Sequence, residues 1–155
     1  MSDRPALTVL KARPAPPRVP AVEISPEQIA LLVDRFYGEI RKHPRLGPLF
    51  EDRLAGKWDP HLQRMNQFWR SVLLHSGEYS GQPVVKHNAL PDLQEDDFRL
   101  WLQQFETTTA ALFEPETAAP ILVIARRIAR SLWLARFGTP FNKAPDWLGL
   151  SLIHI

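Results

Sequence analysis

The chain has 155 residues, the length of a single domain with some additional tail. Its 19 basic and 17 acidic residues give a net charge of +2, which provides no indication of binding to nucleic acid or to a membrane surface. Because the chain contains no cysteine, disulfides, thiolate metal ligands and cysteine nucleophiles are excluded. No segment approaches the roughly 20 apolar residues of a membrane-spanning helix, and we expect a cytoplasmic protein.

Residues 1–22 are rich in proline and are expected to form a flexible arm. They contain Arg4-Pro5, Arg13-Pro14 and the run Pro16-Pro17-Arg18, with no apolar stretch of the kind found in a signal peptide. We expect this proline-rich basic arm to be disordered or extended, as polyproline segments are.

The first helix has a clear predicted start. Ser25-Pro26 offers an N-cap followed by a proline at the first helical position, and Gln28 completes a capping box. An apolar stripe follows at spacings of three and four residues: Ile29, Leu32, Val33, Phe36 and Ile40. Tyr37 lies at the edge of this stripe, and Pro44 is expected to end the helix.

Residues 44–57 are interpreted as a compact connection with about one helical turn. A second helix is predicted from the N-cap Asp59 to a stop at Gly77, with Leu62, Met65, Phe68, Trp69 and Val72 on its apolar face. A short third helix is predicted from Pro83 to Leu90, where it is closed by Pro91 and carries His87.

Two longer helices are predicted over residues 94–113 and 116–137. Their expected inward residues are Phe98, Trp101, Leu102, Phe105 and Leu112 in the first and Ile121, Ile124, Ala125, Ile128 and Leu132 in the second. The cluster of Arg126, Arg127, Arg130 and Arg136 is interpreted as a solvated face. Since no alternating strand pattern occurs, the class is all-α, with residues 23–138 as the domain and residues 139–155 as a C-terminal tail.

Two runs of the sequence together resemble the third group of the truncated haemoglobin family. The first is Phe36-Tyr37 followed by Phe50 and Trp58-x-x-His61-Leu62-x-x-Met65-x-x-Phe68-Trp69, and the second is Tyr79-x-Gly81-x-Pro83-x-x-x-His87 followed by Phe98-x-x-Trp101-Leu102. This resemblance covers residues 25–137. It implies a two-over-two helical sandwich globin around non-covalent haem b, since the C-x-x-C-H motif is absent.

The resemblance also implies a role for each matching residue. His87 falls on the iron ligand, and Tyr37, His61 and Trp101 fall on the positions around bound O₂, NO or CO. Phe50, Met65 and Phe68 fall on apolar wall positions, while Arg64 and Lys86 suit the haem propionates. Asp97 departs from the family pattern, which commonly has histidine there. Three polar groups around the ligand predict slow release of O₂.

Three other readings of the sequence stay open. The first is a haem-dependent redox enzyme that takes electrons from a separate reductase. Such an enzyme would be peroxidase-like or a nitric-oxide dioxygenase. A haem-free helical interaction module that uses the basic arm is a further alternative. His61 and His87 could also bind zinc, although no third ligand follows them at a suitable spacing.

Overall fold

The structure is a computed structural model that describes residues 22–79, 92–139 and 144–146. Five helices are described, in the order α2 (Pro26–Lys42), α3 (Leu46–Leu54), α4 (Trp58–Leu74), α6 (Glu95–Leu112) and α7 (Pro115–Phe137). The all-α class is therefore confirmed. Outside the described residues lie the predicted arm except Val22, the predicted helix Pro83–Leu90 with Lys86 and His87, and most of the predicted tail.

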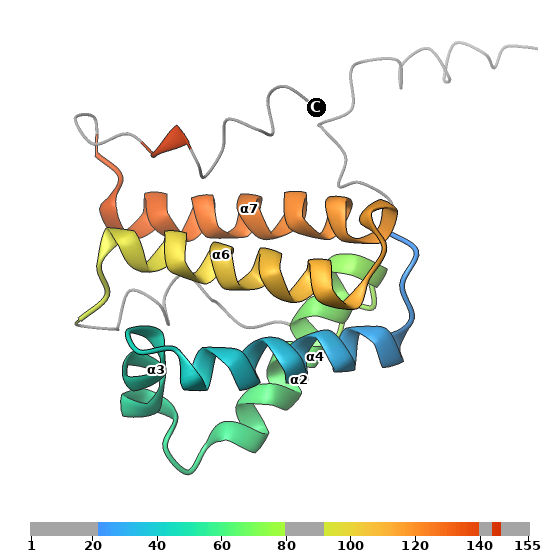
Figure 1. The fold of residues 1–155 in the computed structure, drawn as a ribbon, viewed down its shortest axis with the longest axis horizontal. Coiled ribbons are helices and arrows are strands. Elements are labelled where there is room, and N and C mark those ends of the chain that lie inside the picture. The colour runs from blue at the N-terminus through green and yellow to red at the C-terminus, as the bar shows by residue number, and fades with distance from the viewer. Residues whose placement is uncertain (1–21, 80–91, 140–143, 147–155) are drawn as a thin grey trace, which may run out of the picture.

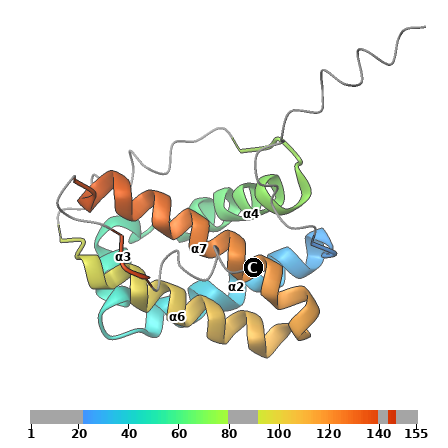
Figure 2. The same cartoon turned by 90° about the horizontal axis from the view of Figure 1, so that it is seen from above.

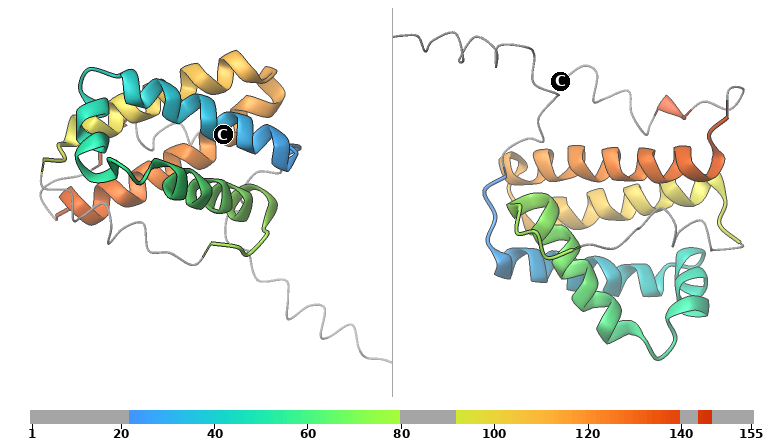
Figure 3. Two further views of the ribbon diagram at one scale, coloured as in Figure 1. Left: turned by 90° about the horizontal axis from the view of Figure 1, so that it is seen from below. Right: turned by 180° about the vertical axis from the view of Figure 1, so that it is seen from behind.

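The helices form two pairs. Helices α6 and α7 run side by side, and α2 and α4 cross each other in the second layer (Figure 1; Figure 2). Helix α2 contacts α3, α4 and α6, so it joins the two layers. From below and from behind, α4 is seen to cross α2 obliquely, with the short α3 in the corner between them (Figure 3). This is the two-over-two arrangement that the resemblance implies.

Helix α2 begins where its capping signals predict. The Ser25 hydroxyl accepts a hydrogen bond from the Gln28 amide at 3.1 Å, and the Gln28 side chain accepts one from the Ser25 amide at 2.8 Å. The predicted stripe is buried throughout, and the helix ends at Lys42, two residues before Pro44. Tyr37, expected at the edge of the stripe, is itself buried, with 5% of its surface exposed.

The interpretation of residues 44–57 as a connection with one turn is wrong, because α3 is a helix of nine residues. The His43 imidazole caps it by accepting hydrogen bonds from the amides of Arg45 and Leu46, both at 3.1 Å. His43 is therefore half-buried. A Cβ at Gly47 would lie 2.6 Å from the Arg41 carbonyl oxygen, so glycine allows the close approach of α3 to α2.

Both predicted ends of the second helix need correction. Helix α4 begins at Trp58 with Lys57 as N-cap, not at Asp59, which lies inside its first turn. It ends at Leu74 and does not continue to Gly77, because His75 already takes the left-handed conformation with φ of 58°. The His75 side chain is exposed.

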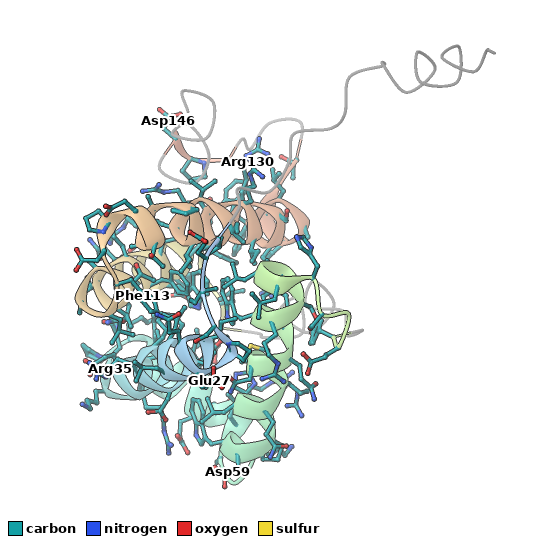
Figure 4. The ribbon with its side chains drawn as sticks, turned by 90° about the vertical axis from the view of Figure 1, so that its right-hand side faces the viewer. Glu27, Arg35, Asp59, Phe113, Arg130 and Asp146 are labelled. Carbon is teal, nitrogen blue, oxygen red and sulfur yellow. The ribbon has the colours of Figure 1, made fainter. Side chains whose placement is uncertain are left out.

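Helices α6 and α7 begin and end within a residue of the predicted bounds. Most of their predicted inward residues are buried, and the others pack partly buried against the core. Trp133, which the predicted stripe omits, is completely buried. Polar side chains such as Glu27, Arg35, Asp59 and Arg130 lie on the outside (Figure 4). Within the described residues, no helix combines the length and apolar character needed to cross a bilayer.

Candidate haem site

A cavity of about 770 Å³ lies between the two helical layers. This volume is within the range of roughly 300–1,000 Å³ that is typical of ligand pockets. All five described helices contribute to its walls, through residues such as Tyr37 of α2, Phe50 of α3, His61 of α4, Trp101 of α6 and Ile128 of α7. The cavity is therefore built by the fold as a whole and not by a single loop.

Seven of the residues predicted for the site line this cavity. They are Tyr37, Phe50, His61, Arg64, Met65, Phe68 and Trp101. The remaining two, Lys86 and His87, lie outside the described residues. Tyr37 and Trp101, which are 64 positions apart in the sequence, thus line the same cavity.

Tyr37 and His61 approach each other at one part of the cavity. Their ring centroids are 5.2 Å apart with the planes at 89°, so one ring presents its edge to the face of the other. Burial, with a smaller contribution from Tyr79, raises the pKa of the Tyr37 phenol well above its ordinary value. The phenol therefore stays protonated at neutral pH and keeps its ability to donate a hydrogen bond.

An aromatic stack supports the wall that carries Trp101. The Trp101 and Phe105 rings are stacked with centroids 5.3 Å apart, and Trp69 stacks on Phe105 at 5.1 Å. Phe36 adds edge contacts to Trp101 at 5.3 Å and to Phe105 at 5.2 Å. Because Phe105 is fully buried, this stack fixes the indole of Trp101 at the cavity wall.

Sequence reasoning missed several residues of the cavity. Arg53 and Lys57 lie on the corner between α3 and α4, and they line the cavity together with Arg64. They were missed because α3 was interpreted as a connection. Tyr79 also lines the cavity and packs edge-on against Phe68, with centroids 5.1 Å apart. The tyrosine was noticed in the sequence, but the direction of its side chain follows only from the fold.

Asp97, the departure from the family pattern, has a clear structural role. Its carboxylate accepts two hydrogen bonds from the Arg45 guanidinium, both at 2.8 Å, and one from the Gln94 amide at 2.8 Å. The side chain is almost completely buried, and the hydrogen bonds raise the pKa of Arg45. Asp97 thus caps α6 and ties it to the start of α3.

The chemistry of the cavity lining fits a haem. A porphyrin is flat and apolar with two carboxylates on one edge, and it needs aromatic or aliphatic walls together with nearby cations. Phe50, Met65 and Phe68 supply such walls, and the three cations Arg53, Lys57 and Arg64 supply positive charge. Among the described residues, no three His, Asp or Glu side chains gather to hold a metal ion without a cofactor.

Two of three comparisons with known proteins find a similar protein. A scan against models of protein families finds no match. The chain is 36% identical over 109 residues to the protein "Group 3 truncated hemoglobin ctb" of Campylobacter jejuni, and the match covers 68% of this chain and 86% of that protein. The crystal structure of group III truncated hemoglobin from Campylobacter jejuni superposes with a TM-score of 0.71 at 33% identity, covering 74% of this chain and 93% of that one.

The fold and the cavity define a globin of the two-over-two class. At this identity and coverage, the chain belongs to the group 3 truncated haemoglobin family. A globin-type role, the binding of haem and of a small gaseous ligand such as O₂, follows from membership of this family.

Proposed function

We propose that the cavity holds haem b without covalent attachment and that His87 is the iron ligand. The absence of cysteine supports non-covalent binding, since a c-type attachment needs two cysteines. The assignment of His87 rests on its place in the family pattern, between Pro83 and Pro91. Arg64 and Lys86 are proposed to pair with the propionates.

The haem iron, once bound, supplies a coordination position for a diatomic ligand such as O₂, NO or CO. The protein then acts on this ligand through Tyr37, His61 and Trp101. The Tyr37 hydroxyl and the Trp101 indole are donors, and the indole cannot accept a hydrogen bond. A ligand with partial negative charge, such as bound O₂, is therefore stabilised by both.

The observation that carries this proposal is the buried phenol of Tyr37, whose pKa is raised by burial, beside His61 in a cavity of suitable size. A hydrogen bond to a charged acceptor contributes about 1–3 kcal/mol, which corresponds to a roughly ten- to hundredfold slower dissociation. A globin that releases O₂ slowly is a poor carrier and is better suited to scavenging, sensing or redox turnover of its ligand.

The proposal is tested by measuring O₂ dissociation from the purified ferrous protein. Tyr37→Phe and Trp101→Phe remove one hydrogen-bond donor each and should accelerate O₂ dissociation. For Tyr37→Phe, we expect the rate to rise roughly ten- to hundredfold. Tyr79→Phe is the matched control, because it removes the hydroxyl of the only other tyrosine of the chain, which also lines the cavity. If neither Tyr37→Phe nor Trp101→Phe accelerates dissociation beyond the control, the proposed donors are wrong.

A further inference from the structure

Trp58, the first residue of α4, packs behind two residues of the haem site without lining the cavity itself. It is buried, with 6% of its surface exposed. Its ring centroid lies 5.9 Å from that of His61 with the planes at 85°, and 6.5 Å from that of Tyr37. The His61 imidazole therefore has both Tyr37 and Trp58 as aromatic neighbours.

The Trp58 ring is in turn held by two charged side chains. Its indole N–H donates a hydrogen bond to Glu51 Oε1 at 2.9 Å, which satisfies the one donor that the ring has. The Arg41 guanidinium lies over the ring at 4.4 Å from the centroid, a cation–π contact. Arg41 and Glu51 also approach each other to 3.9 Å, so the three side chains form one cluster across α2, α3 and α4.

The hydrogen bond between Glu51 and Trp58 spans the sharp corner between α3 and α4. The corner contains Gly56 with φ of +74° and is closed by a backbone hydrogen bond from Lys57 to Leu54 at 2.7 Å. The corner residues 55–57 are exposed and have little packing of their own to fix the start of α4. Trp58 is the buried residue at this start, and Glu51 holds it from the preceding helix.

We propose that Glu51 and Arg41 are positioning residues that act through Trp58. They hold the indole of Trp58 in place, and the indole holds the His61 ring in the cavity. The position of this ring in turn determines how the gaseous ligand enters and which hydrogen bonds it makes. Neither Glu51 nor Arg41 lines the cavity, so any effect on the ligand is indirect. This inference rests on the proposed function, in which His61 faces the ligand.

The experiment compares Glu51→Ala and Glu51→Gln in the holoprotein with CO bound. Glutamine keeps an oxygen acceptor for the indole, and alanine removes it. Glu39→Ala is the matched control, because Glu39 is another partly exposed glutamate whose carboxylate pairs with a lysine, Lys42 at 3.3 Å, and touches no part of the cluster. Two properties are measured: hydrogen exchange of the Trp58 indole proton by NMR, and the C–O stretching band by infrared spectroscopy.

In Glu51→Ala, the indole proton should exchange about tenfold faster, as expected for the loss of one hydrogen bond with a charged acceptor. The C–O band should split or shift, since His61 is released into more than one position. Glu51→Gln and Glu39→Ala should resemble the parent protein in both measurements. In a His61→Leu background, the effect of Glu51→Ala on the C–O band should disappear, because the positioned ring is gone.

Two outcomes overturn the inference. If Glu51→Ala leaves the exchange of the indole proton unchanged, the carboxylate does not anchor Trp58. If exchange accelerates while the C–O band stays the same, or if the band changes equally without His61, Trp58 does not position His61. A parent protein that takes up no haem instead refutes the proposed function, so the two failures are distinguishable.

Discussion

Replacement of Asp97 by alanine should destabilise the protein far more than replacement of its neighbour Asp96. Asp97 is 4% exposed in its side chain and accepts three hydrogen bonds, two from Arg45 and one from the Gln94 amide. Asp96 pairs with Arg99 on the surface, with its side chain 60% exposed. The two substitutions remove the same chemical group from adjacent positions of one helix turn.

The expected decrease in the free energy of unfolding of Asp97→Ala follows from the interactions that the substitution removes. The lost cap of α6 costs about 1 kcal/mol. Loss of the charged hydrogen bonds costs about 1–2 kcal/mol more, because Arg45 is 37% exposed and water can replace the carboxylate. The total of about 2–3 kcal/mol is below the roughly 3–5 kcal/mol that breaking a fully buried ion pair costs. For a chain of this size, it lowers the melting temperature by about 5–10 °C.

The assay is thermal unfolding of the CO-bound holoprotein followed by far-ultraviolet circular dichroism. Asp97→Ala should show the predicted decrease, and Asp96→Ala should unfold within experimental error of the parent, as isolated surface ion pairs contribute little. Arg45→Ala combined with Asp97→Ala should cost less than the sum of the two single changes. Equal effects of Asp96→Ala and Asp97→Ala, or full additivity with Arg45→Ala, would refute the reasoning.

Three further predictions concern the haem site and the end of α4. Because burial raises the pKa of Tyr37, the O₂ dissociation rate should stay constant between about pH 7 and about pH 10. A rate that changes with a midpoint in this range in the parent protein, but not in Tyr37→Phe, would contradict this prediction. Phe68→Ala should release haem to apomyoglobin faster than Leu31→Ala, since Phe68 lines the cavity and Leu31 is exposed; equal rates would argue against this wall. Hydrogen bonding to Arg70 lowers the pKa of Glu78 from 4.5 to about 2, so this carboxylate stabilises the folded state above pH 4.5 and loses that effect as the pH falls toward 2. The difference in thermal stability between the parent and Glu78→Gln should therefore shrink across this window, and a constant difference would contradict the assignment.

The features that are encoded locally were predictable from the sequence. The capping box at Ser25 and the periodic apolar residues defined α2, and the same periodicity defined α6 and α7. The sequence predicts that α4 continues to a stop at Gly77. The helix ends earlier, at Leu74, because His75 already adopts the left-handed conformation. Local patterns thus gave the helices but not all of their ends.

Features that depend on tertiary contacts could not be predicted. Helix α3 has no N-cap of the usual residue types, and it forms because Leu46 and Leu49 are buried and the His43 imidazole caps its start. The role of Asp97 depends on Arg45, which is 52 residues away in the sequence. No local pattern connects such a pair.

Part of the cavity lining was predictable from the sequence, but its charge distribution was not. The family pattern pointed to Tyr37, His61 and Trp101, which line one space in the structure. The contributions of Arg53 and Lys57 follow from the corner between α3 and α4, which was misread in the sequence. Trp133 was missed because α7 is buried over a wider arc than one stripe.

The central claim, that His87 holds haem in this cavity, is tested most directly by haem titration of the parent protein and of His87→Gly. The Soret band of the parent should saturate at one haem per chain, and the ferrous protein should show an iron–histidine stretching band by resonance Raman spectroscopy. In His87→Gly this band should be lost, and added imidazole should restore it. A colourless parent protein, or a His87→Gly variant with an unchanged iron–histidine band, would contradict the account.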